Sequence, residues 1–280
     1  RTSLLTIPLA LIFSSPTFLH ADEKDTIGLT DLLTREPGLN GSNVRIALAE
    51  AQQSPANSGK YQPNPASASQ PASKFSFFDT NNLYPAAGNY DSAKQSSHAN
   101  LVANHYFDLN TGVATDVSEI YVFEAGYFYN TLIRTSTNIN SKVVNQSFVF
   151  NDINSLTDQD YDHYADQHQT LFVNGLGNGS AAITSPATSY NSIAVGREDL
   201  LHSLGPSDNR SKPEIIAPGT ATSYATPYVS GSAAVLIEAA SSPLEHGGTG
   251  TANTASDIRT IKALLLNGAV KDSSWSHTDT

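Results

Sequence analysis

Short apolar segments alternate with helix-like segments along most of this 280-residue chain, and this alternation limits the folds that it can adopt. The apolar runs are typical of buried strands, and the helix-like segments are long enough to cover a sheet. The alternation indicates an α/β fold, with a mostly parallel sheet and helices on both faces. We expect strands within residues 43–51, 119–125, 142–150, 170–176, 191–196 and 213–219, and helices within 92–104, 155–170, 225–240 and 256–270.

The composition excludes several kinds of site and partner. The chain has no cysteine, which excludes disulfides, thiolate nucleophiles, zinc–cysteine sites and iron–sulfur clusters. Its 15 basic and 26 acidic residues give a formal net charge of −11, and an acidic chain repels the phosphates of nucleic acids. Residues 52–72 are rich in Pro, Ser, Gln and Asn, so we expect an exposed irregular loop there.

The first residues have the layout of a secretory signal peptide. Arg1 precedes an apolar stretch over residues 4–13, and small and polar residues follow up to Ala21. The alternative is a buried N-terminal strand or helix, but the acidic DEKD that comes next favours export. We expect residues 1–21 to be a signal peptide, 22–42 a short N-terminal segment, and the protein to be secreted or held in the cell envelope. No second membrane segment is expected.

One serine stands out as a candidate nucleophile. Ser223 precedes a long helix of small apolar residues, and Pro227 falls where we expect the first helical turn. The free N–H groups and the dipole at a helix N-terminus favour negative charge, which suits a nucleophile whose attack creates an oxyanion. The alternative is a serine that only caps the helix.

The string around this serine is similar to the motif of a known family. TSYATPYVSGSAAVL (222–236) resembles the serine-nucleophile motif of the subtilisin-like serine proteases, GTSxATPxVxGxxAxL, with Ala221 in place of a glycine. In that family the triad runs Asp, His, Ser along the chain. SSHANLVAN (96–104) resembles the family's histidine segment, with His98 in the catalytic place. The acid that closes the first strand is Glu50 in this chain, where the family has aspartate.

Two further positions follow from the same resemblance. LFVNGLGNGS (171–180) is similar to the segment with the oxyanion asparagine, which implies that Asn178 donates to the tetrahedral intermediate; the alternative is an ordinary Asn-Gly turn. VVNQS (143–147) stands where the family has an edge strand that pairs with substrate, which implies substrate binding at Ser147. Together the similar segments cover about residues 43–270, in family order throughout.

The sequence also departs from the family. Residues 148–150, Phe-Val-Phe, replace glycines at the mouth of the substrate pocket, and three residues separate Gly219 from Ser223 where a longer hairpin is usual. Asp158, Asp160 and Asp162 copy the start of a calcium loop, but His163 and Gln169 stand where such a loop needs Gly and Glu. We therefore expect a solvated helix face there and no metal or cofactor.

The resemblance implies a single peptidase domain over residues 43–280, whose C-terminal end the sequence leaves open. Its implied activity is serine endopeptidase, with Glu50, His98 and Ser223 as the triad and an acyl-enzyme intermediate. The alternative is a catalytically inactive protein of the same fold that binds peptides or serves at the cell surface. The expected partner is a protein or peptide substrate, with no nucleic acid and no membrane beyond the export signal, and the oligomeric state is left open.

Overall fold

The computed structural model describes residues 22–52, 54–151, 153–179, 182–203, 210–242, 245–246 and 250–270. The expected signal peptide, residues 1–21, lies outside this range. Within the described residues no helix is both long and apolar enough to cross a membrane. The expected short N-terminal segment contains two helices, α1 (Glu23–Thr26) and α2 (Leu29–Arg35).

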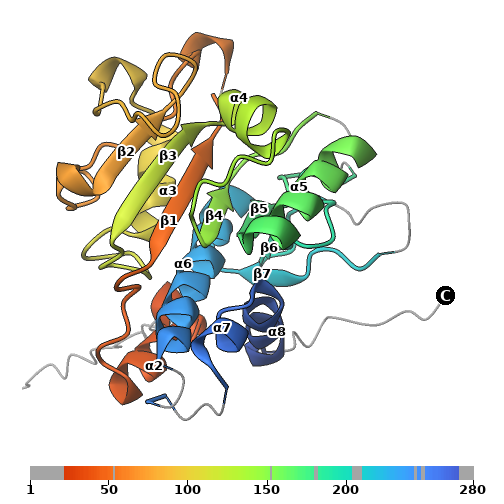
Figure 1. Cartoon of the computed structure of the whole chain (residues 1–280). Helices are drawn as coiled ribbons and strands as arrows, with labels where there is room; N and C mark the ends of the chain where they lie inside the picture. Colours follow the sequence, from red (N-terminus) through yellow and green to blue (C-terminus); the bar gives the residue numbers. More distant parts are fainter. Residues whose placement is uncertain are drawn as a thin grey trace, which may run out of the picture.

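Seven strands form one sheet in which every pair of neighbours is parallel, so the expected α/β fold is confirmed (Figure 1). The order across the sheet is β2-β3-β1-β4-β5-β6-β7. The strands are β1 (Arg45–Glu50), β2 (Phe75–Phe78), β3 (Glu119–Glu124), β4 (Val143–Gln146), β5 (Leu171–Gly175), β6 (Ile193–Arg197) and β7 (Ile215–Ala217).

Further helices connect and cover these strands. They are α3 (Ser97–Tyr106), α4 (Ala125–Tyr127), which runs on as the π-helical turn η4 (Phe128–Ile133), α5 (Ser155–His168), α6 (Thr222–Ser241), α7 (Ala252–Ala255) and α8 (Ile258–Gly268). Three short 3₁₀ turns lie at η1 (Pro55–Asn57), η2 (Ala72–Lys74) and η3 (Ser92–Lys94).

Two adjacent residues of β4 show that helices cover both faces. Asn145 accepts a hydrogen bond from Ser230 of α6 (2.9 Å), whereas Gln146 donates to the hydroxyl of Tyr161 in α5 (2.8 Å). Successive side chains of a strand point to opposite faces, so α6 lies on one face and α5 on the other (Figure 1). Helix α3 packs against α6 and shares its face. Both faces are therefore buried, which explains the continuous apolar runs of the strands.

Helix α6 begins earlier than expected, and this corrects the position of Pro227. The helix starts at Thr222, so Ser223 is its second residue and Pro227 its sixth. A proline at that depth has no N–H to offer the carbonyl of Ser223. The hydroxyl of Ser147 donates to this carbonyl instead (2.9 Å). A side chain from β4 thus repairs the gap that proline leaves in the helix.

The region between β1 and β2 is irregular, and it is exposed as expected around Pro55 and Gly59, but around Tyr61 and Gln70 the expectation of exposure is wrong. Tyr61 and Ala68 are each only 1% exposed and belong to the core. The side chain of Gln70 donates to the carbonyls of Phe107 and Thr115, both at 2.7 Å. Apolar side chains scattered among the polar ones anchor this segment, although no regular period announces them.

The strand expected within residues 142–150 is shorter than predicted and is not an edge strand. It ends at Gln146 and lies between β1 and β5, while β2 and β7 form the edges. Beyond it, the N–H of Phe150 donates to the carbonyl of Ser185 (2.7 Å), which is outside the sheet. The backbone therefore leaves the sheet directly after Ser147.

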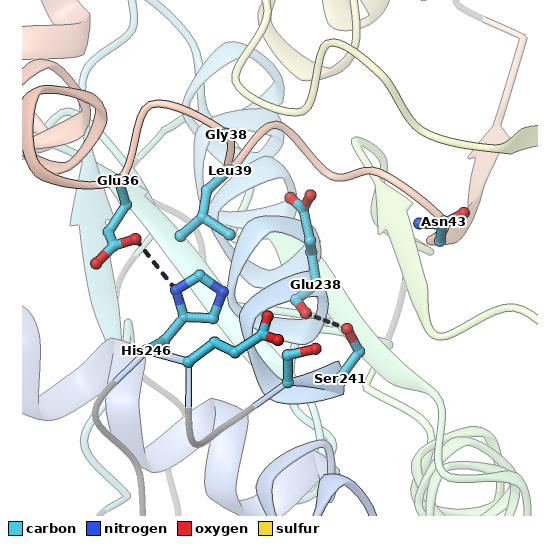
Figure 2. Close-up of a pocket in the computed structure, with 9 residues that line it drawn as sticks. Glu36, Gly38, Leu39, Asn43, Glu238, Ser241 and His246 are labelled. Atoms are coloured by element: carbon cyan, nitrogen blue, oxygen red, sulfur yellow. Dashed lines mark hydrogen bonds and ion pairs between the residues drawn. The ribbon is translucent and has the colours of Figure 1, made fainter.

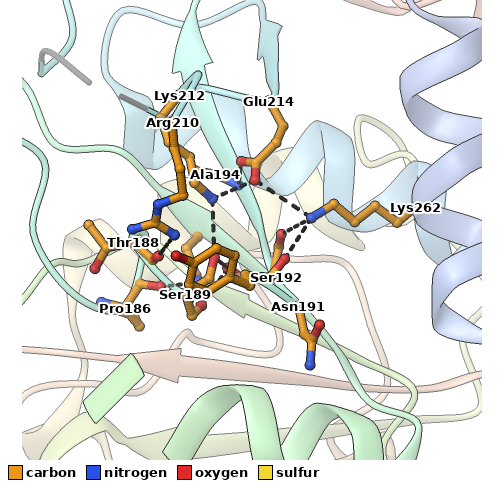
Figure 3. A network of polar contacts seen from close by, with 12 residues as sticks. Pro186, Thr188, Ser189, Asn191, Ser192, Ala194, Arg210, Lys212, Glu214 and Lys262 are labelled. Atoms are coloured by element: carbon orange, nitrogen blue, oxygen red, sulfur yellow. Dashed lines mark hydrogen bonds and ion pairs between the residues drawn. The ribbon is translucent and has the colours of Figure 1, made fainter. Parts of the chain in front are cut away.

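A polar network anchors α8 to the β6–β7 end of the sheet (Figure 3). Lys262 of α8 donates to the carbonyls of Tyr190 (3.0 Å) and Ser192 (2.7 Å). Glu214 pairs with Lys212 and accepts from the N–H of Ala194 (2.7 Å). The ammonium of Lys212 is thus almost fully buried but partnered, which removes most of the cost of burying it.

Candidate active site

The strand order places a candidate site at the carboxyl ends of β1 and β4. From β1 the chain proceeds to β2 on one side of the sheet, and from β4 it proceeds to β5 on the other side. In open parallel sheets, ligands bind outside the carboxyl ends of the strands at such a reversal. Glu50 ends β1 and Ser147 follows β4, one position beyond the paired residues Ala49 and Gln146. The topology alone therefore brings two of the predicted site residues together.

The structure joins Glu50 and His98 as the sequence predicts. Glu50 points to the face that carries α3 and α6. Leu48, two residues before it on β1, is paired with Asn145, whose side chain contacts α6, and alternate residues of a strand share a face. Its Oε2 lies 2.8 Å from Nδ1 of His98, the second residue of α3. Ser96 fixes the start of α3, because its hydroxyl caps the N–H of Ala99 (3.2 Å). Both partners are buried, at 1% exposure for Glu50 and 8% for His98.

Burial and mutual attraction set the protonation of this pair. Burial raises the pKa of Glu50, and the charge and hydrogen bond of His98 oppose that rise. Burial lowers the pKa of His98, but the Glu50 charge and hydrogen bond outweigh it, so the pKa of His98 lies above its usual value. A carboxylate against Nδ1 holds the proton there, which leaves Nε2 as the free basic nitrogen. Among the residues that the structure describes, the other oxygen of Glu50, Oε1, is buried without a hydrogen-bond partner.

Ser223 lies at the start of α6, half-buried, with its side chain turned toward β4. Its Oγ donates to the carbonyl of Ser147 (3.1 Å), and the Ser147 hydroxyl donates back to the carbonyl of Ser223 (2.9 Å). In the part of the chain that the structure describes, no hydrogen bond joins Ser223 to His98. The next residue, Tyr224, has its ring centroid 6.0 Å from that of His98. The structure thus brings the Ser223 segment beside the imidazole, with the hydroxyl in another orientation.

Asn178 lies against the same helix terminus. Its Oδ1 accepts the N–H of Thr222 (2.8 Å), and the hydroxyl of Thr222 accepts the N–H of Gly177 (3.2 Å). These two bonds fasten the loop after β5 to the first turn of α6. The amide nitrogen of Asn178 donates to no group within the described residues, and the side chain is exposed. Asn178 is therefore positioned as a free donor beside Ser223.

The residues behind Ser147 were not found from the sequence. Asn145, fully buried in β4, donates to the Ser147 hydroxyl (3.0 Å) and accepts from Ser230 (2.9 Å). Ser230 follows Ser223 by seven residues, so both lie on one side of α6. That spacing, together with a polar residue inside an apolar strand, was the signal that could have revealed the connection. The network Ser230–Asn145–Ser147 ends on the backbone of Ser223.

A cleft lies near the C-terminal end of α6, away from Ser223 (Figure 2). Its volume is about 240 Å³, and Glu36, Glu238, Glu245 and His246 contribute to its lining. Glu238 comes 15 positions after Ser223, which places it roughly 20 Å along the helix axis. The hydroxyl of Ser241 in its wall donates to the carbonyl of Glu238, not to a base. This acidic cleft is distinct from the site at Ser223.

The described residues contain no cluster of three or more His, Asp or Glu side chains that could hold a metal ion. The three aspartates that resemble a calcium loop lie on α5, but they do not form the expected solvated face, because Asp158 is buried and its Oδ1 has no hydrogen-bond partner among the described residues. Asp160 accepts from Tyr129 (3.1 Å), and Asp162 accepts from the N–H of Asn191 (2.7 Å).

Comparisons with known proteins agree with this architecture. The model of the subtilase family matches residues 55–279, a range that includes His98, Asn178 and Ser223 but begins after Glu50. A solved structure of a cold-adapted subtilisin-like serine proteinase is similar in fold, with 18% identity, a TM-score of 0.58 and coverage of 82% of this chain and 83% of that one. A protease from Pseudoalteromonas arctica is also similar, with 16% identity, a TM-score of 0.55 and coverage of 80% and 84%.

No curated protein matches this chain in sequence. At identities below 20% the two structural likenesses concern the fold alone. The family match rests instead on the sequence and spans most of the chain. By sequence and by fold, the chain belongs to the subtilase family.

Proposed function

We propose that the protein is a serine endopeptidase in which Ser223, His98 and Glu50 form the catalytic triad. The observation that carries this proposal is the buried pair of Glu50 and His98 (2.8 Å) beside the start of α6. A buried carboxylate on Nδ1 orients an imidazole and stabilises its protonated form. Membership of the subtilase family supports peptidase activity in general. Because the family match begins after Glu50, the assignment of Glu50 to the triad rests on its contact with His98.

The reaction proceeds by two acyl transfers. Ser223 Oγ attacks the carbonyl carbon of the peptide bond while Nε2 of His98 takes the hydroxyl proton. The tetrahedral intermediate collapses, the C–N bond breaks, and His98 gives that proton to the leaving amine. A water molecule then attacks the ester carbon of the acyl-enzyme while His98 takes its proton. The C–O bond to Ser223 breaks as His98 returns that proton to Oγ, and the carboxylic acid product leaves. Glu50 remains ionised throughout and balances the charge of His98.

Two donors next to Ser223 suit the oxyanion. The amide nitrogen of Asn178 is free, and the N–H of Ser223 has no acceptor among the described residues, as is usual in the first turn of a helix. The Asn178 carbonyl oxygen is held by Thr222 (2.8 Å), so the amide nitrogen has a fixed direction. Removing one such donor typically raises the barrier by about 3–4 kcal/mol.

The proposal also gives Ser147 a role in substrate binding. In the free protein the Ser147 carbonyl accepts the Ser223 hydroxyl (3.1 Å). When that hydroxyl turns to His98, the carbonyl is free to accept a backbone N–H of the substrate. A rotation about one side-chain torsion is a fast motion at a partly exposed site. Substrate binding and alignment of the nucleophile would then be coupled.

The second candidate function is a catalytically inactive protein of the same fold that binds peptides. Two observations favour it: the Ser223 hydroxyl is bonded to Ser147 and not to His98, and Oε1 of Glu50 has no partner. Under this alternative the site would still present the Asn178 amide and backbone groups to a peptide.

Labelling with a fluorophosphonate probe distinguishes the two functions. We expect an adduct on Ser223, located by mass spectrometry of the digested protein, and no adduct in Ser223→Ala. Ser232→Ala serves as a second control, because it removes another hydroxyl of α6 but keeps the nucleophile. Absence of any adduct on folded wild-type protein would favour the peptide-binding function.

The proposal extends to where the protein acts. The signal-like residues 1–21 support export to the cell exterior or envelope, and the substrate is a protein or peptide. N-terminal sequencing of the exported protein tests this, with Asp22 as the expected first residue. An N-terminus that retains the apolar stretch would contradict it.

A further inference from the structure

Four aromatic rings from α3 and α6 form a ladder beside the proposed triad. Ring centroids lie 6.0 Å apart between His98 and Tyr224, 6.0 Å between Tyr224 and His105, and 5.0 Å between His105 and Tyr228. The histidines are seven residues apart on α3 and the tyrosines four apart on α6, so each pair shares one side of its helix. The two helices pack against each other. The ladder therefore alternates between them and ends on His98.

We propose that Tyr224 is a positioning residue that holds the imidazole of His98 and stabilises its protonated form through the face of its ring, with His105 as the support of that ring. The proposal rests on the proposed role of His98 as the base. Tyr224 directly follows Ser223, so its ring ties the imidazole to the segment that carries the nucleophile. This function does not require the tyrosine hydroxyl, which makes no hydrogen bond within the described residues.

The geometry suits an interaction between a cation and an aromatic ring. The two rings are tilted by 38°, at a separation within the range where a cation is attracted to an aromatic face. His98 gains its positive charge when it takes the Ser223 proton, so the attraction is strongest when the charge develops. Glu50 stabilises the same charge through its contact with Nδ1 of His98. The imidazolium would thus be stabilised by a carboxylate and by a ring.

His105, which packs against the other side of Tyr224, is uncharged in the pH range where the site would be active. Burial lowers the pKa of His105, and the charge of Glu23 in α1 only partly opposes this. His105 therefore stays neutral at neutral pH and does not compete with His98 for the tyrosine ring. In the described part of the chain, Glu50 is the ionisable group whose charge acts on His98, and Glu23 is the one that acts on His105.

The test is a titration of His98 that does not depend on turnover. The Cε1–H signal of His98 is followed by NMR from pH 5 to 9 in full-length Ser223→Ala protein, and His98→Gln identifies the signal. Tyr224→Leu should lower the midpoint of His98 by about half a pH unit, because the ring is lost. Tyr224→Phe should keep the wild-type midpoint, because the ring remains.

Tyr190→Leu is the matched control, since Tyr190 is 65% exposed and has no ring contact with His98. If Tyr224→Leu does not fold, Tyr224→Met fills the same space without a ring and is expected to give the same shift. An unchanged His98 midpoint in the folded variant would overturn the proposal, and so would a shift of equal size in Tyr224→Phe. Failure of the peptidase proposal is separate, because it would show as absent probe labelling in the wild type.

Discussion

At the residue scale, Glu50 has to overcome its own burial before it can orient His98. A carboxylate at 1% exposure strongly favours the neutral form unless a partner compensates. His98 supplies a hydrogen bond to Oε2, while Oε1 has none. Glutamate is one methylene longer than aspartate, yet it still reaches Nδ1 from the last residue of β1. Within the described residues only one of the two carboxylate oxygens is therefore partnered, so part of the cost of burying Glu50 is not offset.

Glu50→Gln should sharply reduce turnover. The amide keeps the size of the side chain but removes the charge that holds the needed tautomer of His98, and in a comparable triad this change costs roughly 10⁴-fold in kcat. The midpoint of the pH–rate profile should also move to lower pH, because the Glu50 charge is what raises the pKa of His98 against burial. Glu124→Gln, at the paired position of β3, is the matched control for both measurements. Unchanged turnover in Glu50→Gln would remove Glu50 from the triad.

Ser147→Ala should destabilise the protein by about 3 kcal/mol. The change leaves the Ser223 carbonyl and the Asn145 amide nitrogen without partners, and each buried unsatisfied group costs about 1–3 kcal/mol. Urea unfolding measures the loss. Ser232→Ala is the control. Like the Ser147 hydroxyl, the Ser232 hydroxyl donates to a carbonyl of α6, but its acceptor is Tyr228 in the same helix. Equal losses in the two variants would mean that the Ser147 hydroxyl does not matter to the start of α6.

The same residues show how far the sequence could predict the site. The chain order and local strings point to Glu50, His98, Asn178 and Ser223, and the structure has all four at one end of the sheet. For Asn145 the signal was a polar residue inside an apolar strand, but its partners could not be read from local strings. The ring ladder gave no such signal, because its contacts depend on the register of α3 against α6.

At the scale of the elements, hydrophobic runs predicted most strands and the main helices. Five strands lie within the expected ranges and β6 runs one residue beyond its range, because continuous apolar runs mark buried parallel strands. Strand β2, with the sequence FSFF, was not predicted. The turn α4–η4 was missed because a π-helical segment does not follow the 3.6-residue period. Tertiary packing decides such elements.

Helix α6 approaches its neighbours through Gly231, and Gly231→Ala should destabilise the protein by about 1–2 kcal/mol. A Cβ at this position would lie 2.5 Å from Cβ of Val113, which is itself buried. Overpacking of this kind costs about 1–3 kcal/mol and outweighs the better helix propensity of alanine. Thermal unfolding measures the change.

Gly268→Ala is the control for this prediction, because Gly268 is also a helical glycine, the last residue of α8, and a Cβ there would meet nothing within 4 Å. It should leave stability unchanged or raise it slightly. Equal melting temperatures for Gly231→Ala and Gly268→Ala would contradict the close approach of α6.

At the scale of the whole molecule, the site joins parts that are far apart in sequence. The topology brings the end of β1, the start of α3 and the start of α6 together at the carboxyl ends of the strands. Each contact in the site therefore joins residues that are far apart in the sequence. If His98 is the catalytic base as proposed, stability and activity depend on pH through the same groups. The pair of Glu50 and His98 connects the two, because its protonation state is set by the folded environment.

Folding raises the pKa values of both Glu50 and His98, so these two groups bind more protons in the folded protein than in the unfolded chain across the intervening pH range. The stability that such groups contribute is fully present below their unfolded pKa values and is lost as pH rises through the folded ones. We therefore expect wild type to gain stability relative to the double variant Glu50→Gln, His98→Gln as pH falls from 8.5 to 5. Urea unfolding of both proteins at pH 5, 6.5 and 8.5 measures the difference. The other titrating groups are common to both proteins and cancel, so a difference that stays constant with pH would show that folding does not raise these two pKa values.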